Sequence, residues 1–118
     1  MLEELGRRAQ DASLVLAEAS EEARNRALEA IAAALEENTA AILAANAKDM
    51  DLGREAGLRQ ARLDRLLLTP ERVKGCADGV RAAAALPDPL GRVLEETTRP
   101  NGLLIRKLSV PMGVIAVI

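Results

Sequence analysis

The side chains of this sequence that could do chemistry are one cysteine, two pairs of adjacent glutamates and several arginines. Cys76 could act as a nucleophile only if its thiol pKa were lowered and a substrate could reach it. Cys76 shares a helical apolar stripe with Val73, Ala77 and Val80, however, and free cysteine is among the most frequently buried residue types. We therefore predict a packed structural thiol and no catalytic residue in this chain.

The paired carboxylates are Glu36-Glu37 and Glu95-Glu96. Adjacent residues on a helix or a strand point in different directions, whereas a general acid needs an enclosed pocket that shifts its pKa. We predict that both pairs are solvated and that Glu96 forms a cross-strand ion pair.

Clustered arginines could hold a phosphate, but acidic residues are interleaved with them, so solvated helix faces are predicted for Arg7, Arg8, Arg54, Arg59, Arg62 and Arg65. The sequence has neither a G-x-x-x-x-G-K-[ST] nor a G-x-G-x-x-G motif. Because it also has no histidine, we predict neither a zinc site nor a histidine-based catalytic triad.

Composition narrows the class of protein further. The 118 residues are 49% apolar but include no aromatic residue, and the formal net charge is -2. This balance argues against a nucleic-acid surface, and no apolar run approaches the roughly 20 residues of a membrane span. With one cysteine and a charged N-terminus, the sequence predicts a cytoplasmic protein with no nucleic-acid or membrane partner.

Apolar spacings of three and four predict helices over most of the first 90 residues. Thr69 is a hydroxyl N-cap followed by Pro70 at the first helical position, Gly57 is a natural residue to follow a helix, and Pro87 ends helix formation. The helices are expected at 2–18, 20–45, 47–56, 59–66 and 70–85.

Strand-like segments at 92–99 and 103–110 flank the turn residues Pro100-Asn101-Gly102. A type I′ turn at Asn-Gly would place Glu96 opposite Lys107. Because an isolated hairpin is marginal in water, we expect this one to pair elsewhere in the protein or on another subunit.

The last residues, 110–118, form a β-branched apolar run interrupted by a proline and a glycine. Such a run is typical of a strand buried on both faces in an α/β protein. A stand-alone helical scaffold or binding domain is the alternative, but it would expose this run, forgoing roughly 1.5–3 kcal/mol for each large apolar side chain.

The residues of several motifs, and the order in which the motifs occur, resemble those of one enzyme family. They are Asn25-Arg26-Ala27-Leu28, Ile42-Leu43-Ala44-Ala45-Asn46-Ala47-Lys48-Asp49, Leu63-Asp64-Arg65-Leu66 with Leu68-Thr69-Pro70, Lys74-Gly75 with Ala77-Asp78, Asp88-Pro89-Leu90-Gly91 and Val110-Pro111-Met112-Gly113-Val114-Ile115. Across the whole chain these residues resemble γ-glutamyl phosphate reductase (glutamate-5-semialdehyde dehydrogenase), a branch of the aldehyde dehydrogenase superfamily. Another branch of that superfamily remains an alternative.

The resemblance implies an aldehyde-dehydrogenase-like α/β fold of which this chain is the N-terminal portion. Residues 1–90 would be the helical part of the nucleotide-binding domain, 91–110 a hairpin of the oligomerisation arm, and 111–118 the first strand of the Rossmann-like sheet.

The resemblance also implies a function in proline biosynthesis. The family reduces L-glutamyl 5-phosphate, a small acyl phosphate, with NADPH, through a cysteine thioester formed downstream of this chain. Cys76 does not match that cysteine, and Ile118 alone matches a position lining the nucleotide pocket. The implied protein partners are other copies of the same enzyme, which would associate through the 91–110 hairpin, and glutamate 5-kinase. The 118 residues alone are expected to be inactive.

Overall fold

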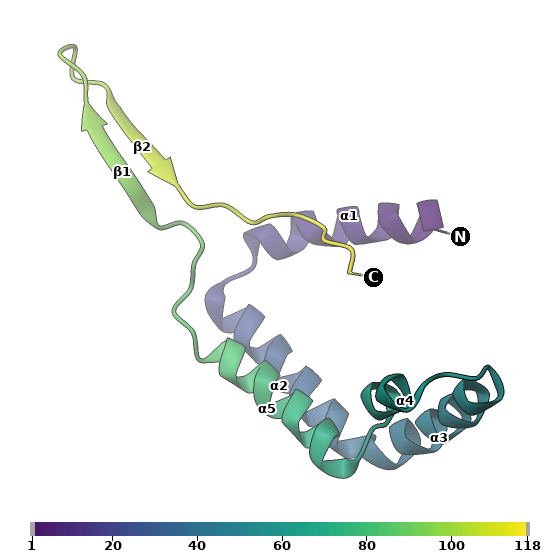
Figure 1. Cartoon of the computed structure of the whole chain (residues 1–118). Helices are drawn as coiled ribbons and strands as arrows, with labels where there is room; N and C mark the ends of the chain where they lie inside the picture. Colours follow the sequence, from purple (N-terminus) through teal and green to yellow (C-terminus); the bar gives the residue numbers. More distant parts are fainter. Residues whose placement is uncertain (1, 118) are drawn as a thin grey trace. The chain divides into compact units, whose positions relative to one another are not determined.

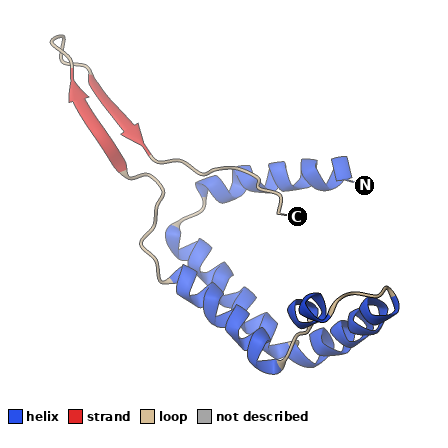
Figure 2. Ribbon diagram, in the orientation of Figure 1, coloured by secondary structure: helices blue, strands red, loops and turns tan. Residues whose placement is uncertain are grey.

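The computed structural model describes residues 2–117 (Figures 1 and 2). These residues divide into two compact units. The helical unit is Asn25–Leu86, and the split unit combines residues 2–24 with 87–117. The helices are α1 (Leu2–Glu18), α2 (Glu21–Glu37), α3 (Thr39–Glu55), α4 (Gln60–Leu66) and α5 (Pro70–Ala84). The strands β1 (Val93–Thr98) and β2 (Leu104–Leu108) form one antiparallel hairpin.

The helical unit contains the buried side chains of the described residues. Its apolar core consists of Ala32, Met50, Leu63, Val73 and Ala77. Within this unit α2 and α5 lie side by side (Figure 1), and each helix fully buries a small residue, Ala32 on α2 and Ala77 on α5. As predicted, α5 begins at the Thr69-Pro70 pair, where the Thr69 hydroxyl accepts a hydrogen bond from the Arg72 N–H at 3.2 Å.

The boundary between the second and third helices differs from the prediction. One helix was expected over 20–45 and another over 47–56, but α2 ends at Glu37 and α3 runs from Thr39 to Glu55. Asn38 donates from Nδ2 to the Ala34 carbonyl at 2.8 Å, and the Thr39 hydroxyl donates to the Glu36 carbonyl at 2.8 Å. Side chains that bond the carbonyls of the preceding turn compete with helix continuation, so the chain breaks at Asn38 rather than near residue 46.

The hairpin register also differs from the prediction by one residue. Glu96 lies opposite Arg106, and Glu95 takes the place opposite Lys107. The reason is the turn: only Gly102 has a positive φ, +85°, while the Asn101 φ is negative. A three-residue loop of this kind, a type I turn followed by a left-handed glycine, therefore replaces the expected two-residue type I′ turn.

The predicted strand over 111–118 is not formed in the described part of the chain, residues 111–117. A strand needs a hydrogen-bonded neighbour, and β1 and β2 pair only with each other. Gly113 also has a φ of +84°, which bends the segment away from extended geometry. Ile118, the predicted nucleotide-pocket residue, lies outside the described residues.

Candidate functional site

The hairpin is the first candidate, as a surface for association. Leu104 and Leu108 lie on one face of β2 and are 44% and 48% exposed, while Ile105 on the other face is 47% exposed. Glu96 and Arg106 form a cross-strand ion pair at 2.6 Å between Oε2 and Nε. The ion pair predicted for Glu96 is confirmed, with Arg106 rather than Lys107 as its partner. Both faces thus offer uncovered apolar area beside a fixed charge pair.

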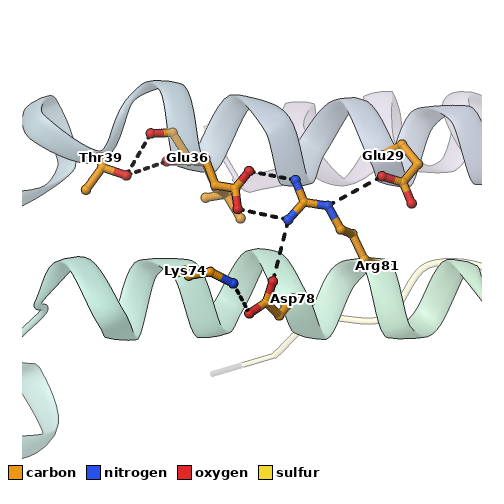
Figure 3. Close-up of polar contacts among 7 residues, drawn as sticks. Glu29, Glu36, Thr39, Lys74, Asp78 and Arg81 are labelled. Atoms are coloured by element: carbon orange, nitrogen blue, oxygen red, sulfur yellow. Dashed lines mark hydrogen bonds and ion pairs between the residues drawn. The ribbon is translucent and has the colours of Figure 1, made fainter.

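The second candidate is a cluster of charges between α2 and α5 (Figure 3). Arg81 donates two hydrogen bonds to the Glu36 carboxylate, from Nη1 to Oε1 at 2.9 Å and from Nη2 to Oε2 at 2.6 Å. It also approaches Glu29 at 3.5 Å and Asp78 at 3.6 Å, and Asp78 accepts from Lys74 at 2.6 Å.

These contacts make the cluster a structural clamp rather than a site for proton transfer. The hydrogen bonds from Arg81 lower the pKa of Glu36, and those to Glu36 raise the pKa of Arg81. Glu36 is therefore held as a carboxylate, whereas a general acid must be able to carry a proton near neutral pH. As predicted, Glu36 is exposed to solvent, but its paired hydrogen bonds from Arg81 were not predicted from the sequence.

Cys76 is exposed, so the prediction of a packed thiol was wrong. The buried face of α5 is carried by Val73 and Ala77, and Cys76 lies beyond its edge. Cys76 borders an open hollow of about 490 Å³ in the helical unit, lined also by Asp64, Arg65, Leu67, Leu68, Arg72 and Gly75.

The arginine beside Cys76 in this hollow already has partners. The Arg72 guanidinium donates to the carbonyls of Asp64 and Leu67, the latter at 2.6 Å. Because the sequence has no histidine, a cysteine–histidine pair cannot form at this exposed thiol.

Asn46 is a buried polar residue that was not singled out from the sequence. Its side chain is 6% exposed, and it donates from Nδ2 to the Leu66 carbonyl at 2.9 Å while Oδ1 accepts the Leu68 N–H at 2.8 Å. The amide thereby fixes the extended connection between α4 and α5. A signal was available, because Asn46 occupies a helical spacing from Leu43 and Met50 on an otherwise apolar stripe.

Arg24 and Asp88 form a half-buried ion pair inside the split unit. The Arg24 guanidinium pairs with the Asp88 carboxylate and also donates to the Ala19 carbonyl. Asp88 Oδ1 accepts the Leu90 N–H at 3.0 Å. Asp88 belongs to the Asp88-Pro89-Leu90-Gly91 motif, and its contacts tie that loop to the start of α2.

Besides the hollow at Cys76, a smaller one of about 250 Å³ lies beside Asn46, and neither contains the Gly-rich strand-to-helix turn on which a pyrophosphate rests. Residues 2–117 contain no cluster of three metal-ligating side chains, and none of their helices is long and apolar enough to span a membrane.

Comparison with known proteins gives a consistent picture, although no family model matches the chain. The γ-glutamyl phosphate reductase of Paramagnetospirillum magneticum is 49% identical over 118 residues, 100% of this chain and 28% of the relative. That of Moorella thermoacetica is 53% identical over 113 residues, 96% of this chain and 27% of the relative.

Two solved structures that match the chain are also γ-glutamyl phosphate reductases. The crystal structure of γ-glutamyl phosphate reductase from Thermotoga maritima matches with a TM-score of 0.89 and 33% identity, over 93% of this chain and 27% of that chain. The enzyme from Saccharomyces cerevisiae matches with a TM-score of 0.83 and 30% identity, over 92% of this chain and 28% of that chain. The chain is therefore homologous to γ-glutamyl phosphate reductases, and spans little more than a quarter of their length.

Proposed function

We propose that this chain supplies the N-terminal part of an NADPH-dependent γ-glutamyl phosphate reductase, which converts L-glutamyl 5-phosphate to L-glutamate 5-semialdehyde and phosphate in proline biosynthesis. The observation that carries the proposal is identity of 49–53% to reductases of this name over nearly the whole chain. The motifs named above that resemble the family are spread from Asn25 to Ile115, so the similarity is not confined to one element.

In this proposal the described residues act as scaffold. The thioester-forming cysteine and the cofactor site belong to parts of the enzyme that residues 2–117 do not contain, with Ile118 alone placed at the nucleotide pocket. The 118 residues by themselves then have no turnover. Cys76 has no role in the reaction, which agrees with its open surroundings.

We further propose that subunits associate through the 91–110 hairpin. The uncovered apolar side chains on both faces of the hairpin support this, as do its unpaired outer edges, which are templates for strand pairing. The acyl phosphate is the small-molecule partner, glutamate 5-kinase is the proposed protein partner, and the enzyme is placed in the cytoplasm.

A chimera tests the reductase proposal. Residues 1–118 replace the matched segment of the Moorella thermoacetica reductase in one continuous chain, and NADP⁺ reduction is measured with glutamate 5-semialdehyde and phosphate. We expect turnover that requires phosphate and is unchanged by Cys76→Ser. A folded chimera that oxidises simple aldehydes but not glutamate 5-semialdehyde would favour another branch of the superfamily.

A further inference from the structure

A polar network holds the base of the hairpin within the split unit. Arg24, near the start of α2, pairs through its guanidinium with the Asp88 carboxylate and also donates to the Ala19 carbonyl in the connection between α1 and α2. Both side chains of the ion pair are half-buried, 23% and 22% exposed. Because a guanidinium presents several donors in a rigid planar fork, one side chain bonds the helix connection and the loop before β1 at once.

Ser109 continues the network at the hairpin itself. Its hydroxyl accepts the Arg92 N–H at 3.0 Å and donates to the Pro89 carbonyl. Its backbone carbonyl accepts the Gly91 N–H at 3.0 Å, and its N–H donates to the Arg92 carbonyl at 3.0 Å. Ser109 directly follows β2 and its partners lie just before β1, so these hydrogen bonds join the two ends of the hairpin to the preceding loop.

Asp88 connects the two halves of the network. Its Oδ2 bonds Arg24, while Oδ1 accepts the Leu90 N–H at 3.0 Å. A carboxylate oxygen that accepts the N–H two residues further on fixes a tight turn, and the Pro89 carbonyl in that turn is the one that Ser109 bonds. A connected set of contacts therefore runs from the connection between α1 and α2 to the base of the hairpin.

This network acts on the direction of the hairpin rather than on its strand pairing. The β1–β2 ladder fixes the two strands against each other, whereas the contacts at the base fix the hairpin to the start of α2. An element that is already held in its bound direction loses less freedom on association. Resting on the proposed association of subunits through the 91–110 hairpin, we propose that Arg24, Asp88 and Ser109 are positioning residues, which hold the hairpin in the direction in which it meets the other subunit.

The test measures the oligomeric state of the single-chain chimera across a dilution series by analytical ultracentrifugation. Arg24→Ala and Asp88→Ala should each weaken subunit association about tenfold, because apparent affinity falls with the fraction of molecules already in the competent arrangement. Ser109→Ala should act in the same direction. The variant that carries both Arg24→Ala and Asp88→Ala should associate no more weakly than Asp88→Ala alone, since both changes break the same ion pair.

Hydrogen exchange separates a loss of direction from a loss of structure. The amides of Leu90 and Arg92 at the base of the hairpin should exchange faster in Arg24→Ala and Asp88→Ala. The amide of Arg99, which bonds the Leu103 carbonyl at 2.9 Å beside the turn, should exchange as in wild type, and circular dichroism should show unchanged helix content.

Arg54→Ala and Asp51→Ala are the matched controls. They break an ion pair at 2.7 Å whose side chains are exposed and lie in the helical unit, so both variants should associate as wild type does. Wild-type association of Arg24→Ala and Asp88→Ala, equal weakening by the control variants, or faster exchange at Arg99 would overturn the inference.

Ile105→Lys tests the proposed association separately, because Ile105 is a 47% exposed side chain of the hairpin itself. If Ile105→Lys weakens association while Arg24→Ala and Asp88→Ala do not, only the inference fails. If the wild-type chimera does not associate, or if Ile105→Lys associates as wild type does, the proposed association through the hairpin fails and the inference fails with it.

Discussion

Replacing Asn46 with alanine should destabilise the helical unit more than its loss of size suggests. The Asn46 amide is 6% exposed and serves two backbone groups, the Leu66 carbonyl at 2.9 Å and the Leu68 N–H at 2.8 Å. Leaving a buried polar group without a partner costs about 1–3 kcal/mol. With two partly buried groups orphaned, we expect Asn46→Ala to lower the free energy of unfolding by roughly 2–4 kcal/mol.

Asn38→Ala provides the control, because Asn38 is an exposed asparagine whose Nδ2 donates to the Ala34 carbonyl at 2.8 Å. It should change the free energy of unfolding by no more than about 0.5 kcal/mol. Urea unfolding followed by far-ultraviolet circular dichroism measures both variants, and amide exchange at Leu68 reports the local contact. Equal destabilisation by the two alanine variants, or unchanged Leu68 exchange in Asn46→Ala, would refute the reasoning.

The variant Asn46→Asp tests separately the hydrogen bond that Asn46 Nδ2 donates to the Leu66 carbonyl. A carboxylate keeps the acceptor for the Leu68 N–H but sets a negative oxygen against the Leu66 carbonyl. The pKa of the introduced carboxyl should therefore be higher in the folded protein than its unfolded value of about 3.9. A raised carboxyl pKa gives stability that is present below the unfolded pKa and lost as pH rises through the folded pKa, so the deficit against wild type should shrink on acidification. A deficit that grows toward low pH would contradict this.

The remaining contacts give three other predictions. The pKa of Glu36 is lowered by its hydrogen bonds from Arg81. The extra stability of wild type over Glu36→Gln should therefore be present above the unfolded pKa of Glu36 and vanish as pH falls through its folded pKa. Unfolding measured at a series of acidic pH values checks this, and a difference in stability that does not depend on pH would count against it. Gly102 has a φ of +85°, so Gly102→Ala should cost the hairpin roughly 1–2 kcal/mol, seen as faster amide exchange at Arg99; unchanged exchange would show that the turn tolerates a Cβ. Cys76 should react fully with a thiol reagent in native buffer, because its side chain is exposed, and labelling only in denaturant would contradict that exposure.

Helix positions could be predicted where the signal was local. The Thr69-Pro70 start of α5 and the end of α3 before Gly57, whose φ is +70°, follow from cap chemistry within a few residues. The boundary between the second and third helices was predicted near residue 46 and not at Asn38, because the alanine-rich sequence on both sides of Asn38 favours a continuous helix. The competing bonds from Asn38 and Thr39 to carbonyls of the preceding turn decided it.

The failures among the candidate sites have a different cause. Turn type depends on which of Asn101 and Gly102 takes a positive φ, and a one-residue difference there shifts the whole register. Cys76 was assigned to the core because its spacing fits a wide apolar stripe, but α5 buries only the narrow edge at Val73 and Ala77. Burial depends on how closely the neighbouring helices approach, which periodicity alone does not specify.

Reductase activity of the single-chain chimera is the most direct test of the central claim. Residues 1–118 joined to the unmatched part of the Moorella thermoacetica reductase should reduce NADP⁺ with glutamate 5-semialdehyde only when phosphate is present. A folded, oligomeric chimera with no such activity, beside an active parent enzyme measured under the same conditions, would contradict the claim that this chain is the N-terminal part of a γ-glutamyl phosphate reductase.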